Sequence, residues 1–295
     1  MSLTLPAPVV SPPVPDPPAS RRRRRDSVRQ VALFVLLALL GAAVLAPFAW
    51  MVVSSLKRDD RVFTVPIEWI PKDVKWDNYL HIWQEIPLGT YLGNSAILAV
   101  SITLLQVLSG SFAAYGFAKV RFRGRDALFL AYVATIAVPW QAYMVPQYIL
   151  MDRLGLVNTR WSLILLQAFG AFGVFLMRQY YLTIPDELIE AARLDGLTEF
   201  GIWGRIALPL SKPALASLAL LTFVNTWNDY MGPFIYLTSN DLWTVQIGLR
   251  SFVGVYDAQY AMIMTGSVLS VLPILAVFLL GQRYFVEGIA TSGLK

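Results

Sequence analysis

The chain holds few side chains of the kind that perform catalysis or bind metal ions. It has no cysteine and one histidine, His81, so thiolate nucleophiles, cysteine-ligated metals and multi-histidine metal sites are excluded. Neither G-x-x-x-x-G-K-[ST] nor G-x-G-x-x-G occurs, so we expect no nucleotide to bind through either type of loop. The sequence therefore predicts no metal site, and it disfavours an enzyme that carries its own cofactor.

One polar segment, residues 185–209, lies between two long apolar runs. Its sequence is PDELIEAARLDGLTEFGIWGRIALP, in which five acids are interleaved with Arg193 and Arg205. The spacing of these acids matches no catalytic pattern. Two interpretations remain: a docking surface for a soluble partner, or an amphipathic loop that lies at the membrane interface without a partner.

A second polar group, Asn225, Trp227, Asn228 and Asp229, lies at the end of an apolar run. An ionised aspartate at the bilayer centre costs about 2.5–3.5 kcal/mol, so such residues face protein or a water-filled cavity. Amide and carboxylate groups beside an aromatic ring also suit the hydroxyls and the apolar face of a sugar. The group is therefore interpreted either as part of a solute path or as a hydrogen-bonded gate between subunits.

The composition of the chain is typical of a membrane protein. Hydrophobic residues make up 56% and charged residues only 15%, whereas soluble domains average about a quarter charged. Six runs without Asp, Glu, Lys or Arg are each about long enough to cross a hydrocarbon core of about 30 Å as a helix. They are residues 31–56, 86–118, 127–151, 161–177, 213–228 and 258–282. We therefore predict an all-α polytopic membrane protein with six transmembrane helices.

The first 29 residues differ in composition from the rest. They contain seven of the 18 prolines and the run Arg21–Arg25, and such a segment has little to bury. We predict a disordered tail over residues 1–29 and one membrane domain over residues 30–295. The arginine run is interpreted as a cytoplasmic topogenic signal beside anionic lipid rather than as a nucleic-acid site.

The distribution of basic residues predicts the orientation in the membrane. With the N-terminus inside, the inner segments hold 16 of the 24 Lys and Arg residues. Positively charged residues concentrate on the cytoplasmic side of membrane proteins. Both termini are therefore predicted to be cytoplasmic, and residues 178–212 form a cytoplasmic loop between the fourth and fifth spans.

Two features of the third apolar run bear on a gate. Pro139 lies within this run and is expected to kink it. The residues that end the run near the predicted outer face are Tyr143, Met144, Pro146 and Gln147. Either feature is compatible with a gate, and the sequence alone does not choose between them.

The polar segment itself predicts two short helices. Pro185 suits the first turn of a helix, and Gly196 is placed to end that helix at its C-terminus. A second helix, about 198–207, is expected to begin at Thr198 and to end before Pro209, because proline disfavours helical geometry in the preceding residue.

Side-chain spacing gives each of these helices a candidate contact face. Ala191 and Ala192 form a flat patch that would let another backbone approach closely. Phe200, Trp203 and Ala207 share one face at helical spacing, which suits a membrane interface or a hydrophobic groove.

A family resemblance rests on this segment. Glu190, Ala191 and Ala192 are followed after three residues by Gly196 and after nine more by Ile206-x-Leu208-Pro209. This pattern resembles the EAA loop of the inner-membrane permease subunits of bacterial ABC importers, with all seven positions filled. Stretches that resemble the carbohydrate-type permeases are Asn94-Ser95, Ala113-Ala114-Tyr115, Phe122-Arg123-Gly124-Arg125 and Trp227-Asn228-Asp229-Tyr230. The resemblance covers roughly residues 30–295.

The resemblance implies a division of labour between subunits. An extracytoplasmic solute-binding protein would deliver a sugar or related polyol to a pair of permease subunits in the lipid bilayer. Two copies of a separate ATPase would bind ATP and Mg, so this chain would hold no cofactor and would not be an enzyme. Glu190, Ala191 and Gly196 would contact the ATPase, through a carboxylate, a close-packed surface and the turn between the helices respectively.

Two alternatives belong to other functional classes. An ion-coupled secondary transporter would need intramembrane ionisable groups, and Asp229 is the only clear one in this sequence. No inverted repeat is evident either, which such transporters often have. A polytopic membrane enzyme is disfavoured because the sequence has neither a His/Cys cluster nor paired intramembrane carboxylates.

Overall fold

The computed structural model describes residues 19–254 and 258–292, with side chains placed for residues 29–254 and 258–282. In this described part every regular element is a helix, and Val253 and Ala258 form only an isolated bridge. The prediction of an all-α protein is confirmed for these residues. The α-helices are α1 Ala19–Ser55, α2 Asn78–Glu85, α3 Leu88–Lys119, α4 Arg125–Ala134, α5 Met144–Arg153, α6 Arg160–Gln167, α7 Ala171–Tyr181, α8 Asp186–Leu194, α9 Glu199–Ile202, α10 Leu208–Leu210, α11 Lys212–Trp227, α12 Met231–Tyr236, α13 Val245–Arg250 and α14 Tyr260–Ser292.

Short helical turns join several of these helices. The 3₁₀ turns are η1 Asp59–Arg61, η2 Thr135–Ala137, η3 Trp140–Ala142 and η5 Asn240–Leu242, and η4 Trp203–Ala207 is a π-helix. The chain divides into two compact units, residues 1–50 and residues 51–295.

The first unit contains most of α1, which begins at Ala19. The helix therefore includes the run Arg21–Arg25, where the sequence predicted disorder. Arginine is a good helix former, and an apolar helix already formed downstream is readily extended. The disordered tail over residues 1–29 stays a prediction. Residues 1–18 of the predicted tail lie outside the described residues.

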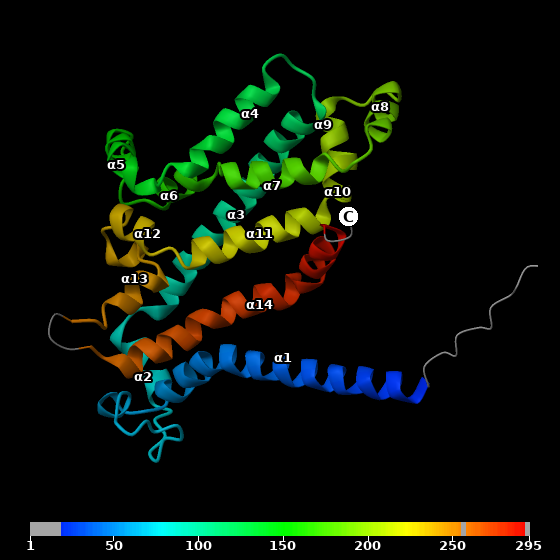
Figure 1. The fold of residues 1–295 in the computed structure, drawn as a ribbon. Coiled ribbons are helices and arrows are strands. Elements are labelled where there is room, and N and C mark those ends of the chain that lie inside the picture. Colours follow the sequence, from blue (N-terminus) through cyan, green and yellow to red (C-terminus); the bar gives the residue numbers. More distant parts are fainter. Residues whose placement is uncertain (1–18, 255–257, 293–295) are drawn as a thin grey trace, which may run out of the picture. The chain divides into compact units, whose positions relative to one another are not determined.

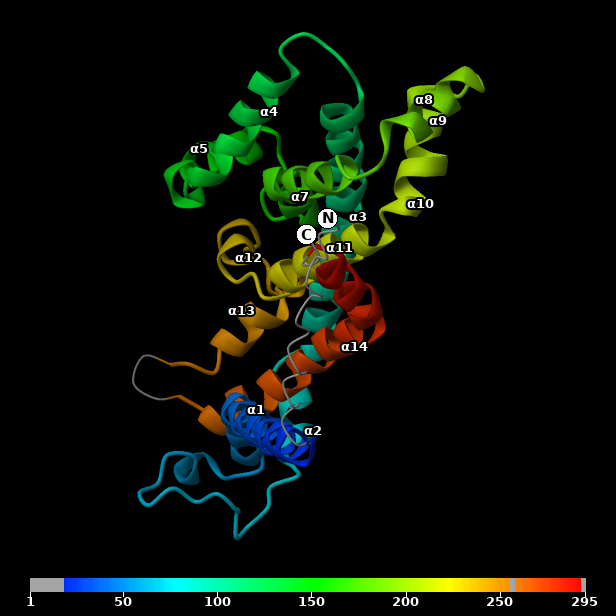
Figure 2. The ribbon, with the colours of Figure 1, turned by 45° about the vertical axis from the view of Figure 1, so that its right-hand side comes forward.

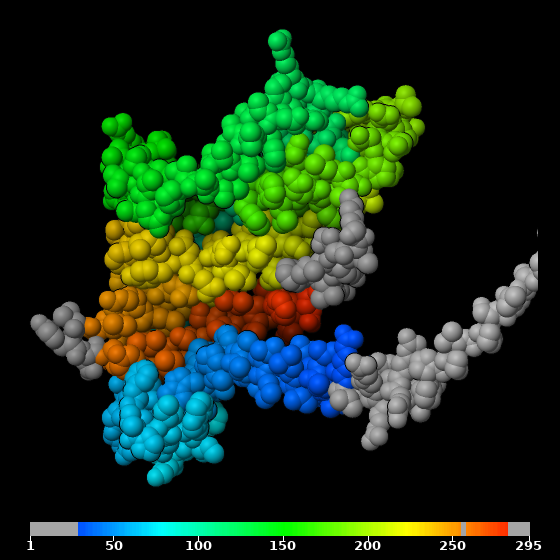
Figure 3. Space-filling model, viewed as in Figure 1, coloured from blue at the N-terminus to red at the C-terminus, as the bar shows by residue number. Residues whose placement is uncertain are grey.

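The second unit is a helical bundle built around α3. In Figures 1 and 2, α3 packs along α7 and α11, and α11 packs along α14. Helices α3 and α7 lie close together at Gly110, where an added Cβ would lie 3.5 Å from the carbonyl carbon of Gly173. Small residues at such crossings let helix backbones approach closely. Figure 3 shows α7, α11 and α14 as successive green, yellow and red bands.

Among the described residues, four helical stretches are long and apolar enough to span a membrane. They are Arg29–Ser55, Leu88–Lys119, Arg160–Tyr181 and Tyr260–Gln282. A fifth span results if Glu199–Leu210 and Lys212–Trp227, which meet at an angle of 83°, are counted together. Three features remain predictions. They are the number of six spans, the cytoplasmic location of both termini, and the cytoplasmic location of the loop over residues 178–212.

The predicted third span, residues 127–151, is broken rather than merely kinked. Helix α4 ends at Ala134, and α5 begins only at Met144 after two 3₁₀ turns. Val138 is extended, with φ −84° and ψ 114°, because it precedes Pro139. The proline therefore accounts for the end of η2 at Ala137, and the chain passes through η3 before α5.

Candidate coupling loop and solute cavity

Helix α8 has the ends that the sequence predicted. It begins at Asp186, directly after Pro185, and carries acids in its first turn, where the positive end of the helix dipole favours them. At its C-terminus Gly196 adopts φ 82°, a left-handed conformation that favours glycine. The amides of Gly196 and Leu197 donate to the carbonyls of Arg193 and Ala192 at 3.1 and 3.0 Å. This pair of bonds is a Schellman motif, so the turn between the two helices is rigidly defined.

The second helix of the loop begins as predicted but ends later. The Oγ1 atom of Thr198 accepts a hydrogen bond from the Gly201 amide at 3.2 Å, which caps the helix. The chain then continues through the π-helix η4 and α10 to Leu210, so the prediction of an end before Pro209 is wrong. Leu208 keeps helical dihedral angles, φ −59° and ψ −51°. A π-helical turn already departs from the regular i→i−4 bonding, so the N–H that proline lacks costs less there.

The residues predicted to contact an ATPase differ in exposure. Glu190, Ala191 and Gly196 are exposed, as a docking surface requires, whereas Ala192 is only 4% exposed and packs inside this chain. The flat two-alanine patch predicted from the sequence is thus reduced to Ala191. Of the remaining EAA positions, Ile206 and Leu208 are half-buried and Pro209 is exposed. Among the described contacts, no hydrogen bond or ion pair involves the Glu190 carboxylate.

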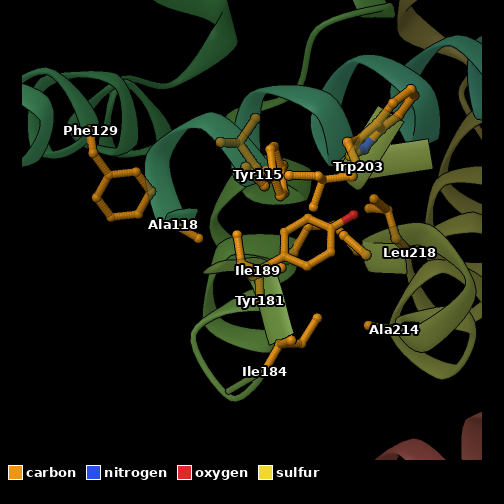
Figure 4. Close-up of a cluster of buried hydrophobic side chains, with 14 of the residues drawn as sticks. Tyr115, Ala118, Phe129, Tyr181, Ile184, Ile189, Trp203, Ala214 and Leu218 are labelled. Atoms are coloured by element: carbon orange, nitrogen blue, oxygen red, sulfur yellow. The ribbon is translucent and has the colours of Figure 1, made fainter. Parts of the chain in front are cut away.

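The aromatic face of the second helix points mostly into the protein. Trp203 and Ala207 are buried, and the indole Nε1 of Trp203 donates to Ser111 Oγ of α3 at 3.0 Å. A membrane interface or partner groove was therefore the wrong interpretation for these two residues. The buried tryptophan instead joins a core in which Tyr115, Tyr181 and Leu218 from three other helices meet beneath the loop (Figure 4).

Lys119, at the last turn of α3, anchors the start of α8. Its side chain is only 4% exposed, and its Nζ donates to the Ile184 carbonyl and to Asp186 Oδ1, both at 2.6 Å. The hydrogen bond from Lys119 holds the pKa of the Asp186 carboxyl below its usual range. A lowered pKa means that the pair stabilises the fold at neutral pH and loses this effect only as the pH falls through that pKa.

Arg193 and Glu199 link the two helices of the loop to α3. Arg193 donates to Glu199 Oε1 at 2.7 Å and to the Lys119 carbonyl at 3.0 Å. The Tyr115 hydroxyl donates to Glu199 Oε2 at 2.7 Å. Sequence reasoning did not predict that Tyr115 and Lys119 hold the loop, because their contacts with Glu199 and Asp186 join positions 84 and 67 residues apart. Together the contacts fix both loop helices to the end of α3, so a force on the loop would reach the helix around which the bundle is built.

Replacing Lys119 with methionine should loosen α8 without unfolding the bundle. The variant removes hydrogen bonds from a charged group, each contributing about 1.5–3 kcal/mol. Amide hydrogen exchange of α8 should therefore become at least about tenfold faster, since 1.4 kcal/mol corresponds to a factor of ten. Lys212→Met, at an exposed lysine, is the matched control. Equal exchange of α8 in both variants would contradict the anchoring role.

A separate cavity of about 370 Å³ lies between α3, α6 and the segment after α11. Its polar lining combines the carboxylate of Asp229 with three side-chain amides, Gln106, Gln147 and Gln167, beside the rings of Trp140 and Tyr143. Amides, a carboxylate and aromatic faces together can bind hydroxyl groups and the apolar face of a ring. Of the predicted gate residues, Tyr143 and Gln147 therefore reach the same cavity as Asp229.

Two hydrogen bonds position the Asp229 carboxylate. Gln167 Nε2 donates to Oδ2 and the Gly232 amide donates to Oδ1, both at 3.1 Å. Gly232 also leaves space for this carboxylate, because a Cβ there would lie 2.6 Å from Oδ2. The amides of the cavity wall are themselves ordered: Gln106 accepts from Thr222 Oγ1 at 2.5 Å, and Gln147 accepts from Trp140 Nε1 at 2.9 Å.

The other three residues of the predicted path lie elsewhere. Trp227 is 2% exposed, and its Nε1 donates to the Ser270 carbonyl at 3.1 Å, so it belongs to the core. Asn225 and Asn228 are exposed and do not line the cavity, and the Asn228 amide donates to its own helix at the Val224 carbonyl. Sequence reasoning missed Gln106 and Gln167. The signal that could have found them is a lone amide within an otherwise apolar run.

Comparison with known proteins identifies the family. Residues 106–290 match the family described as binding-protein-dependent transport system inner membrane component. The chain belongs to this family. The matched region contains both the loop and the cavity, and a protein of the family is a multi-pass component of the inner membrane. The transport-permease relatives are not themselves enzymes, and none of them supports ion-coupled transport.

Individual relatives of this permease match along almost their whole length. The arabinooligosaccharides transport system permease protein AraQ of Halalkalibacterium halodurans is 34% identical over 93% of this chain and 99% of its own. The lactose transport system permease protein LacG of Rhizobium radiobacter is 32% identical over 92% and 97%. The sn-glycerol-3-phosphate transport system permease protein UgpE of Yersinia enterocolitica is 33% identical over 84% and 92%.

A solved structure has the same fold as this permease. It is a chain of a bacterial ABC transporter involved in the import of the acidic polysaccharide alginate, with a TM-score of 0.77 and 25% identity. The similarity covers 89% of this chain and 98% of that one. Membership of the family implies a partner permease, an ATPase and a solute-binding protein.

Proposed function

We propose that this permease subunit moves a sugar or related polyol across the cytoplasmic membrane by alternating access, driven by ATP hydrolysis in a separate ATPase. The observation that carries the proposal is the loop of α8 and α9: it exposes Glu190 and Ala191 while its buried side is fixed to α3 by Lys119, Arg193 and Glu199. The names of the relatives support the solute class, because they include permeases for arabinooligosaccharides, lactose and glycerol phosphate.

The proposed contact with the ATPase has three parts. Glu190 offers a carboxylate to a basic residue or a helix N-terminus of the partner. Ala191 lets the partner pack closely against α8, and Gly196 supplies the turn that sets the angle between the loop helices. Of the remaining EAA positions, Ala192 supports these residues from inside the loop, whereas Ile206 and Leu208 are half-buried and Pro209 is exposed. Two short, capped helices transmit a displacement better than a flexible Gly/Ser loop would.

The proposed assembly follows the family. Six spans with both termini in the cytoplasm place the loop on the side where ATP is available. Two ATPase copies bind ATP and Mg, and this chain binds neither. An extracytoplasmic protein delivers the solute, and the cavity beside Asp229 is the proposed contact of this subunit with it. The cavity suits such a solute because it combines hydrogen-bonding groups with aromatic rings.

Gentle purification of the tagged chain tests this proposal. We expect an ATPase and a second permease to co-purify, and uptake by proteoliposomes of the complex to stop when the ATPase carries a substitution that abolishes hydrolysis. A chain that purifies alone and drives uptake from a proton or sodium gradient would overturn the proposal.

A further inference from the structure

An apolar groove of about 580 Å³ runs beside the last turns of α3, away from the solute cavity. Phe112 and Phe200, two of its walls, are 50% and 66% exposed. The lining residues are Phe112, Ala113, Tyr115, Gly116, Phe117, Val120, Phe122, Glu199 and Phe200. Gly116 leaves the groove open, because no neighbouring atom lies within 4 Å of the place where its Cβ would be.

A polar hollow of about 400 Å³ adjoins this groove at the turn between α3 and α4. Phe122 lines both, so the groove and the hollow adjoin at this residue. The turn protrudes beyond the helices on either side of it (Figure 3). The hollow is lined by Arg121, Phe122, Gly124, Arg125, Asp126 and Ala127.

Arg121 is the cation of the hollow that is available for an anion. Arg125 and Arg178 both donate to Asp126 Oδ1, at 3.3 and 3.1 Å, and their charges are partly balanced by it. No ion pair in the described part of the chain involves Arg121, and its side chain is exposed; its charge acts on the Asp186 carboxylate, which Lys119 already pairs. Arginine binds phosphate groups well, through several N–H donors in one plane.

An exposed stripe of α3 leads from the middle of this apolar helix to the groove. Val100, Leu104, Leu108 and Phe112 follow one another every four residues and are 48%, 58%, 50% and 50% exposed. Residues at this spacing lie on one face of a helix. In a membrane-spanning helix such a face lies against hydrocarbon, so the groove opens onto the acyl chains of the bilayer.

We propose that the groove and the hollow together bind one anionic phospholipid, with its phosphate at Arg121 and an acyl chain along Gly116 and Phe112. The occupant is a lipid rather than a free anion because the larger part of the site is apolar and continuous with the exposed stripe. The inference rests on the orientation in the proposed function, which places this end of α3 at the cytoplasmic, anionic surface of the membrane.

The site adjoins the anchors of the coupling loop. Glu199 lines the groove, and the same carboxylate accepts hydrogen bonds from Tyr115 and Arg193. Phe200 packs against Phe112 across the groove, with ring centroids 6.0 Å apart. A bound acyl chain would therefore touch the residues that fix the loop helices to α3, and lipid composition would affect coupling.

Native mass spectrometry of the complete importer in detergent tests the proposal, with phosphatidylglycerol and phosphatidylcholine as probes. The wild-type complex should retain phosphatidylglycerol. Arg121→Gln should weaken retention at least about tenfold, because in the proposed site Arg121 hydrogen-bonds the phosphate directly, and hydrogen bonds to charged groups contribute about 1.5–3 kcal/mol. Gly116→Leu, which fills the groove, should weaken it severalfold. The matched controls are Gly93→Leu, at an open position of the same helix, and Arg123→Gln, outside the hollow.

Three results of the lipid assay would overturn the proposal. They are equal retention by all variants, equal retention of the two lipids by the wild type, and displacement of the lipid by inorganic phosphate. A cysteine at position 116 that the second permease shields in lipid-free detergent would also overturn it, because the groove would then be a subunit interface. Lipid retention needs no transport. A complex that retains the lipid but shows no ATP-driven uptake would contradict the proposed function alone.

Discussion

Replacing Glu190 with lysine is expected to abolish ATP-driven uptake while the protein still folds and inserts. The carboxylate is exposed and makes no hydrogen bond or ion pair among the described contacts, so the fold does not depend on it. Removing one partner of a buried charge pair at an interface costs about 2–5 kcal/mol. Charge reversal should therefore reduce uptake and stimulated ATP hydrolysis by at least about thirtyfold.

The matched control for this variant is Asp195→Lys. Asp195 is also an exposed acid and is the C-cap residue of α8. It lies roughly 140° around the helix axis from Glu190. Its reversal should leave uptake nearly unchanged, because a lysine is favourable near a helix C-terminus. Glu190→Gln, which keeps the shape and loses the charge, should give an intermediate rate. Similar uptake by Glu190→Lys and Asp195→Lys would show that Glu190 does not carry the coupling contact.

Replacing Asp229 with alanine is expected to change which solutes are transported. The carboxylate lines the cavity and is positioned by Gln167 and Gly232, so it offers a fixed acceptor to a solute hydroxyl. A hydrogen bond to a charged group contributes about 1.5–3 kcal/mol, which corresponds to at least about a tenfold loss for the solute that makes it. Solutes without that hydroxyl should lose less.

Competition between several sugars and polyols in an uptake assay measures this change. Asn228→Ala is the matched control, because Asn228 is the neighbouring residue and does not line the cavity. Asp229→Asn should restore part of the original preference, since the amide oxygen still accepts hydrogen bonds. A uniform decrease for all solutes would indicate that Asp229 only supports the structure.

Local features of the loop could be read from the sequence. Pro185, Gly196 and Thr198 act through their own backbone or their nearest neighbours, so their positions predicted the start of α8, its end and the start of the second helix. The predicted end of the second helix, before Pro209, was wrong. The π-helix η4 that precedes Pro209 depends on packing against α3 and not on the proline alone.

Contacts between distant segments could not be read in this way. The burial of Trp203 and Ala192 follows from helices that the sequence alone did not place beneath the loop. In the second polar group, only Asp229 reaches the cavity. It lies beyond the end of α11 at Trp227, where the period of a helix no longer predicts the direction of a side chain.

Single-cysteine cross-linking tests the central claim, that the exposed side of α8 is the contact with the ATPase. The chain has no cysteine of its own, so each introduced thiol is unique. Ala191→Cys and Ala192→Cys compare neighbouring alanines, of which the first is exposed and the second is 4% exposed. We predict that position 191 cross-links to the ATPase, with a yield that changes on ATP binding, and that position 192 does not. An intact complex in which position 191 never cross-links, or cross-links no better than position 192, would contradict the account.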